Sequence, residues 1–429
     1  MRKNFYVITS FLLFVLTSFA QTNIPLIKAN SKKISIRDGD QSVTKYWDYL
    51  STTIKPVVYN ISKTNKKRHL VFYTDIDSIA FDISPNNKYD FKVLLHSKDT
   101  CYVQISTIIP RYYINCQNCV ITTDSIPFTL GNDQYIHIKG KVNDSKTLDF
   151  IFDTGASCVL LTESGLKKAK IKLDGFTDNQ GSGGFSIEQT SNANHLELSK
   201  LEWKNLPLLY INYKGSLKAD GVIGFNIFED KVVEIDYDKK LLIIHSQLPL
   251  NKAGYAKLEM HHDLNGSFIQ ATLNNGQKDS KGWFLFDTGG NLTVVVNADF
   301  SLSNKLFGTM KKLGSSQIEG TGKNIISSET VLLPRFKLMD NVLSDVPVLL
   351  QGSNVNTSGN AGIIGNGVLK RFNVLIDYPD ATIYLKPNSL FNTSFERNDN
   401  RILKLLCFAG VFIILVIGLR YLQKTMGKK

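Results

Sequence analysis

The chain carries two copies of one sequence pattern, and this internal repeat limits its possible folds more than any other feature. Asp149-Phe-Ile-Phe-Asp-Thr-Gly-Ala-Ser in the first half matches Gly282-Trp-Phe-Leu-Phe-Asp-Thr-Gly-Gly-Asn in the second. Further along, Asp220-Gly-Val-Ile-Gly matches Ala361-Gly-Ile-Ile-Gly in the same order. Since each copy of such a repeat corresponds to one structural unit, the pattern predicts two homologous lobes.

The spacing of the copies supports this division. The offset is 134 residues at the first motif and 141 residues at two later points, given by the pairs Asp153/Asp287, Gly224/Gly365 and Asp236/Asp377. Two lobes that differ by a seven-residue insertion account for all three offsets. We assign the lobes to residues 121–250 and 251–390.

Asp-Thr-Gly follows an apolar strand in both copies, and an apolar-apolar-Gly segment comes later in each (Val222-Ile-Gly and Ile363-Ile-Gly). These motifs resemble those of retropepsin/pepsin-like aspartic peptidases over residues 125–387, some three-fifths of the chain. The resemblance implies a mainly β, bilobal aspartic-protease fold with two β-barrel-like lobes. It also implies that a single chain supplies both catalytic aspartates.

The resemblance assigns roles to the motif residues. Asp153 and Asp287 become the catalytic pair of an aspartic endopeptidase, because two carboxylates about 3 Å apart share one proton and can activate a water. Supporting roles fall to two threonines, whose hydroxyls bond the backbone of the opposite lobe, and to two glycines, whose N–H groups approach the carboxylates: Thr154, Thr288, Gly155 and Gly289. A peptide or protein substrate is the expected partner.

A glycine-rich hairpin that closes over the substrate is also expected from the resemblance. Candidate residues lie in two segments, and ordinary loops are the alternative in both: Gly183, Gly184 and Phe185 in the first lobe, Gly320 and Thr321 in the second. The first candidate contains no tyrosine, unlike the pepsin pattern. Glycines would let such a flap move.

The residues after the two motifs suggest a particular pH dependence. Ala156 and Gly290 stand where pepsin-like enzymes carry a serine or threonine. Because neither residue has a hydroxyl to donate to a charged carboxylate, the dyad pKa is expected to rise. The sequence therefore predicts an activity optimum at mildly acidic or near-neutral pH.

The two ends of the chain predict a membrane-anchored protein. Residues 1–20 have the layout of a secretory signal peptide, with an uncleaved anchor as the alternative. Residues 402–422 are apolar enough for one transmembrane helix, with a buried core helix as the alternative. The basic tail 423–429 places the catalytic region on the periplasmic or extracellular side.

The net charge of +12 supports this topology rather than a nucleic-acid partner. Residues 1–20 carry +2 and residues 401–429 carry +6, so only +4 remains for the 380 residues between them. We therefore expect no nucleic acid as partner. His261-His262 lacks the partner ligands of a metal motif, and we expect neither a metal nor another cofactor.

Residues 21–120 read as a small β-rich region without recognisable chemistry. An inhibitory pro-segment and a β domain that docks on the catalytic unit both remain open. A structural disulfide among Cys101, Cys116 and Cys119 is possible, since Cys116-Gln-Asn-Cys119 lacks the setting of a zinc or redox motif. The alternative to an enzyme is a non-catalytic peptide- or partner-binding protein that keeps the fold.

Overall fold

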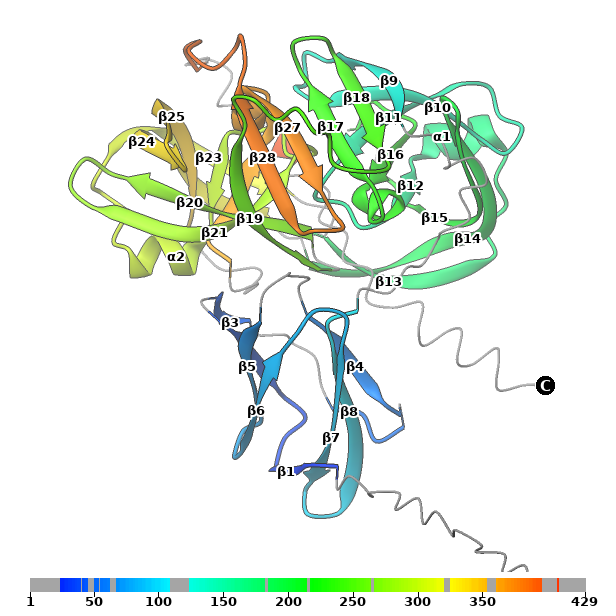
Figure 1. Ribbon diagram of the computed structural model, residues 1–429, viewed down its shortest axis with the longest axis vertical. Helices are drawn as coiled ribbons and strands as arrows, with labels where there is room; N and C mark the ends of the chain where they lie inside the picture. Colours follow the sequence, from blue (N-terminus) through cyan, green and yellow to red (C-terminus); the bar gives the residue numbers. More distant parts are fainter. Residues whose placement is uncertain are drawn as a thin grey trace, which may run out of the picture.

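The computed structural model shows a mainly β protein, as predicted, with two lobes side by side and a smaller β unit below them (Figure 1). It describes residues 24–39, 41–44, 50–53, 55–61, 67–108, 123–181, 184–213, 217–263, 266–319, 325–352, 360–395 and 407–408. Among these residues, no helix combines the length and the apolar character needed to cross a bilayer.

The N-terminal unit consists of two four-stranded sheets that enclose their own core. One sheet has the order β1-β7-β8-β4 and the other β3-β2-β5-β6. Alternating apolar residues of both sheets, Phe72 and Phe91 among them, fill the space between them. The strands are β1 Leu26–Ala29, β2 Ser35–Asp38, β3 Gln41–Thr44, β4 Val57–Asn60, β5 Arg68–Tyr73, β6 Ser78–Ile83, β7 Lys88–Leu95 and β8 Asp99–Ser106.

The first lobe runs from β9 to β18 and includes the 3₁₀-helix η1 and the short α-helix α1. Thr162 begins that helix by accepting a hydrogen bond from the Gly165 N–H, as expected of an N-cap threonine. Its elements are β9 Thr123–Leu130, β10 Ile136–Val142, β11 Leu148–Asp153, β12 Val159–Leu161, α1 Glu163–Ala169, β13 Gly175–Gly181, β14 Gly184–Leu198, β15 Leu201–Tyr210, β16 Gly221–Gly224, η1 Phe225–Phe228, β17 Val232–Asp236 and β18 Leu241–His245.

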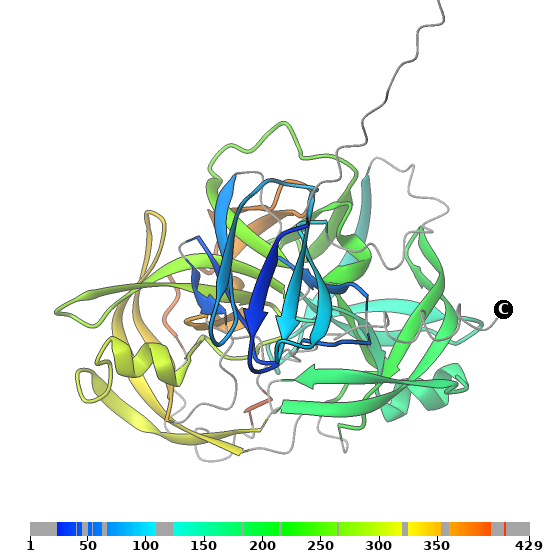
Figure 2. The same ribbon diagram turned by 90° about the horizontal axis from the view of Figure 1, so that it is seen from below.

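The second lobe repeats this order of elements from β19 to β28. Figure 2 shows the lobes on opposite sides of the molecule, with the N-terminal unit in front. The elements are β19 Ala256–Asp263, β20 Gly266–Asn274, β21 Asp279–Asp287, β22 Val294–Val296, α2 Ala298–Ser303, β23 Lys311–Glu319, β24 Ile325–Leu338, β25 Asn341–Gln351, β26 Gly362–Gly365, α3 Asn366–Leu369, β27 Phe372–Asp377 and β28 Thr382–Pro387.

A six-stranded antiparallel sheet joins the lobes, which the prediction of two barrel-like lobes did not include. Its order is β9-β18-β17-β27-β28-β19, with three strands from each lobe. At its centre Glu234 of β17 pairs with Leu375 of β27, its own counterpart at the 141-residue offset. The axis that relates the two lobes therefore passes through this residue pair.

Several predictions fall on residues that the structure does not describe. The signal peptide 1–20, the tail 423–429, and the pair Cys116 and Cys119 all lie outside the described residues. Of the expected span 402–422 only the backbone of β29, Cys407–Phe408, is described, and it is a strand. Cys101 is a buried free thiol in β8, so a disulfide that includes Cys101 is wrong.

Candidate active site

Both Asp-Thr-Gly motifs stand at the end of a buried strand. Asp153 ends β11 and pairs with Gly224 of the parallel strand β16; Asp287 ends β21 and pairs with Gly365 of β26 in the same register. The apolar-apolar-Gly segments thus lie directly beside the motif strands in both lobes. Because β16 and β26 are buried at every residue, they read as continuous apolar runs rather than alternating ones.

The two carboxyl groups meet at the interface between the lobes, and each aspartate is only 1% exposed. Asp153 Oδ1 accepts hydrogen bonds from the N–H groups of Gly155 at 2.7 Å and Ala156 at 3.1 Å. The N–H groups of Gly289 and Gly290 lie near enough to Asp287 to lower its pKa, although its carboxyl oxygens make no hydrogen bond of ordinary geometry in the described part of the chain.

Each motif glycine faces the carboxylate of the other lobe. A Cβ built on Gly289 would lie 2.1 Å from Cγ of Asp153, and one on Gly155 would lie 2.7 Å from Oδ1 of Asp287. Only glycine leaves room for such an approach. The two glycines therefore set how closely the carboxylates of the two lobes can come together.

The two threonines interlock the lobes below the carboxylates. Thr154 Oγ1 donates to the carbonyl oxygen of Phe286 at 2.8 Å and accepts the N–H of Thr288 at 3.0 Å. Thr288 Oγ1 makes the equivalent bonds to the carbonyl oxygen of Phe152 at 2.9 Å and to the N–H of Thr154 at 3.0 Å. Both threonines are fully buried, so these four bonds fix the relative position of the two motif loops.

Burial raises the pKa of both carboxyl groups. Desolvation is the main cause at Asp153, where repulsion from Asp287 raises the pKa further and the N–H groups of Gly155 and Ala156 oppose the shift. Desolvation also raises the pKa of Asp287, while the neighbouring Asp153 carboxyl group and the amides of Gly289 and Gly290 oppose this shift. Such a pair holds one shared proton over a range of pH where isolated aspartates would both be charged.

The second motif loop is one residue longer than the first. In the first lobe, Ala156 and Cys158 accept the N–H groups of Phe225 and Gly224 through their carbonyl oxygens. In the second lobe, Gly290 and Thr293 accept those of Asn366 and Gly365. The extra residue lies beyond Gly290, so it leaves the backbone next to Asp287 in the same arrangement as in the first lobe.

The flap candidates are only partly described. Gly184 and Phe185 begin β14 and pair through the backbone with Gly181 and Gln180 of β13, which gives a hairpin at the expected position in the first lobe. Gly183, Gly320 and Thr321 lie outside the described residues. A second hairpin, β23–β24, flanks the latter two in the second lobe.

The histidine pair His261-His262 packs within the second lobe. His261 stacks on Trp283 with ring centroids 3.8 Å apart. His262 bonds Ser267 Oγ through Nδ1 at 2.9 Å and contacts the Phe225 ring. Both side chains thus contribute to packing near the junction of the lobes.

Sequence reasoning missed one polar cluster close to the motif. His137 of β10 lies between the carboxylates of Asp133 and Asp149, and Asp149 belongs to the strand that ends at Asp153. A signal was available, because Asp149 aligns with the apolar Trp283 in the second repeat. A charged residue at a position that is apolar in the other copy indicates a local polar partner.

Comparison with known proteins gives one family match, which lies in the first lobe. Residues 138–227 match the family model described as aspartyl protease, which confirms the resemblance seen in the sequence for the first lobe. Among solved structures, an aspartic proteinase from Irpex lacteus is similar at 13% identity and a TM-score of 0.43, over 64% of this chain and 100% of that one. No curated protein matches the chain in sequence.

Proposed function

We propose that this protein is an aspartic endopeptidase in which Asp153 and Asp287 form the catalytic dyad. The proposal rests on one observation: two buried carboxyl groups from different lobes lie next to each other. Crossed threonine hydrogen bonds join the two loops that carry these groups. A structural role does not account for two adjacent buried acids, because burying them costs free energy that a neutral pair would avoid.

The arrangement supports hydrolysis by an activated water. The ionised carboxyl group takes a proton from a water held between the two acids, while the protonated one donates to the scissile carbonyl oxygen. Attack of the water oxygen on the carbonyl carbon gives a gem-diol, and its collapse breaks the C–N bond as the amine takes up a proton. No covalent adduct with the enzyme forms. The pair titrates as a unit, so neither aspartate has a fixed role.

The substrate we propose is an extended peptide or protein segment. It would lie across the interface between the lobes and pair through its backbone in the manner of an added strand. The β13–β14 hairpin, at the position where the resemblance places the flap, consists of antiparallel strands suited to such pairing. A single bilobal chain is sufficient for this chemistry, since it contributes both carboxylates.

We further propose that the enzyme acts outside the cytoplasm while anchored by a single membrane span. The support comes from the sequence: an apolar N-terminal segment typical of signal peptides and a second apolar run followed by basic residues. Protease accessibility of residues 24–395 in intact cells, compared with lysed cells, tests this orientation.

Cleavage of a peptide library by the wild type and two variants tests the activity. We expect Asp153→Asn and Asp287→Asn each to reduce the rate by at least about 10³-fold. Asp236→Asn is a control, because Asp236 is also a buried aspartate at the end of a strand, and its carboxylate accepts the Lys239 N–H and forms an ion pair with the Lys239 ammonium. Wild-type cleavage by either dyad variant would contradict the proposal. Inhibition by a pepstatin-type compound would support it.

A further inference from the structure

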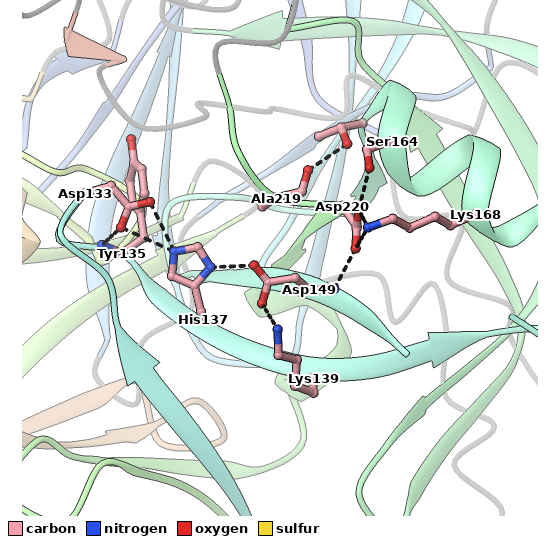
Figure 3. Close-up of polar contacts among 10 residues, drawn as sticks. Asp133, Tyr135, His137, Lys139, Asp149, Ser164, Lys168, Ala219 and Asp220 are labelled. Carbon is pink, nitrogen blue, oxygen red and sulfur yellow. Dashed lines mark hydrogen bonds and ion pairs between the residues drawn. The ribbon is translucent and has the colours of Figure 1, made fainter. Parts of the chain in front are cut away.

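A row of charged side chains lies behind the strand that carries Asp153 (Figure 3). His137, whose side chain is 11% exposed, places Nδ1 2.8 Å from Asp149 Oδ2 and Nε2 3.2 Å from Asp133 Oδ2. Lys139 Nζ contacts the other oxygen of Asp149 at 2.8 Å. The imidazole therefore joins two carboxylates that belong to different segments of the first lobe.

At one end of this row, hydrogen bonds of Asp149 and Asp220 join the strands β11 and β16. The N–H of Asp149 donates to Asp220 Oδ2 at 3.0 Å, and the N–H of Asp220 donates to the Asp149 carbonyl at 2.7 Å. Lys168 and Ser164 bind the same Asp220 carboxylate. Because Asp149 lies in β11 and Asp220 directly precedes β16, these bonds fix the register of the two strands that end at Asp153 and Gly224.

The other end of the row reaches the second lobe. Asp133 belongs to the turn at residues 131–135, where its Oδ1 accepts the N–H of Tyr135 at 3.2 Å. In this turn the Gln134 carbonyl accepts from Asn366 Nδ2 at 2.5 Å, and Gln134 Oε1 accepts from Lys370 Nζ. Asn366 follows Gly365, which pairs with Asp287. The turn thus connects the His137 cluster to the backbone beside the second catalytic carboxylate.

The fold does not require these charges. The register of β20 on β21 places Phe268 where the first lobe has His137 and Trp283 where it has Asp149. Ala361 stands in place of Asp220. The second lobe builds the same strand pairs with these apolar residues, so the polar row serves a purpose other than forming the sheet.

We propose that His137 is a positioning residue: it ties the strand of Asp153 to the 131–135 turn and so holds the two halves of the dyad in place. The proposal rests on the proposed function for its catalytic consequence. A doubly protonated imidazole donates to Asp149 and Asp133 at once, whereas a neutral imidazole can donate to only one of them. The charged form is therefore the one that completes the connection.

The surroundings of His137 favour its charged form. Its pKa is raised, first by the hydrogen bond with Asp149 and then by the charges of Asp149 and Asp133, against the effect of burial. Lys139 on the same strand and Tyr135 in the turn also belong to this cluster, while β9 and β11 place the uncharged Thr129 and Ile151 opposite His137. The connection is complete below this raised pKa and is weakened as the pH rises through it.

Steady-state kinetics of the full chain on one cleaved peptide tests the proposal. We expect His137→Phe, which introduces the residue used by the second lobe, and Asp133→Ala each to lower kcat about tenfold with KM within about twofold. The double variant His137→Phe/Asp133→Ala should lose no more kcat than either single variant, since each of the three variants breaks the same connection between β11 and the 131–135 turn. The pH profile of kcat should lack one ionisation in His137→Phe. His69→Phe removes an exposed His–Asp pair in the N-terminal unit and should change neither quantity.

Amide hydrogen exchange separates this proposal from the proposed function. If the chain cleaves no peptide, the proposed function fails. Amide exchange still shows whether His137 holds the two motif strands in place. We expect the Thr288 and Asn366 amides to exchange about tenfold faster in His137→Phe than in His69→Phe. If His137→Phe does not fold, Asp133→Ala at the half-exposed turn serves alone. Unchanged exchange, a wild-type kcat, or additive losses in the double variant would overturn the role of His137.

Discussion

Replacement of Thr154 by valine tests whether the crossed hydrogen bonds hold the two lobes together. Valine has nearly the shape of threonine but cannot hydrogen-bond. Thr154→Val leaves the carbonyl of Phe286 and the N–H of Thr288 without their partner, and both lie in the buried motif loops. An unsatisfied buried polar group costs about 1–3 kcal/mol. The expected loss of unfolding free energy is therefore about 2–6 kcal/mol, a large share of the stability of an ordinary domain.

Urea unfolding followed by tryptophan fluorescence measures this loss. Trp203 reports on the first lobe and Trp283 on the second, so a loss that separates the lobes appears as two distinct transitions. Thr154→Ser is the matched control, because it keeps the hydroxyl and removes one methyl group, worth about 0.8 kcal/mol. Thr288→Val should cost as much as Thr154→Val, since it orphans the Phe152 carbonyl and the Thr154 N–H.

One outcome would refute this reasoning. Suppose that Thr154→Val lost less than about 1 kcal/mol of unfolding free energy and that this free energy depended on urea concentration as in the wild type. The crossed hydrogen bonds would then contribute no more than an average solvent-exposed hydrogen bond. The position of the motif loops would then have to come from the six-stranded sheet and from the bonds of Gln134 to Asn366 and Lys370.

Three further predictions concern the dyad and its surroundings. Gly289→Ala places a Cβ 2.1 Å from Cγ of Asp153, and peptide cleavage should fall at least about 10²-fold with an unchanged circular dichroism spectrum. Because burial raises the pKa of both acids, the singly protonated dyad and the peak of kcat/KM should lie at mildly acidic pH; a peak below about pH 3 would contradict this. Tyr237→Phe removes the 2.5 Å bond to Asn366 Oδ1 and should cost about 1 kcal/mol in urea unfolding.

The repeat made most of the fold and the centre of the candidate site predictable. Asp153 and Asp287 are identified by the Asp-Thr-Gly motif, whose sequence is restricted by close packing. A larger residue in place of the glycine, or a shift of the aspartate from the end of its strand, would move the two carboxyl groups apart. The two lobes follow from the same duplication. The pairing of Val222-Ile-Gly beside the motif strand also follows, because a strand buried on both faces must be apolar throughout.

The shared sheet could not be predicted in the same way. Its strands come from both lobes, and the pairing of Glu234 with Leu375 joins residues 141 positions apart. Period-two patterns identify strands but not their partners. The connection from Gln134 to Asn366 spans 232 residues, and nothing in either local sequence specifies the other.

The departures from symmetry separate what the chemistry needs from what each lobe adds. The aspartates, threonines and glycines are the same in both lobes and occupy equivalent positions, since each acts on the opposite lobe across the axis. His137, Asp149 and Asp220 have only apolar counterparts, although they lie within the same strand pairs. Both lobes need the aspartate, threonine and glycine of the motif, because these residues bring the two acids together. The polar cluster around His137 is needed in only one lobe, because a single connection sets the position of that lobe against the other. For this reason we expect variants of the dyad and of its glycines to reduce cleavage by at least about 10²-fold, and variants of the His137 cluster to reduce it less and in a pH-dependent way.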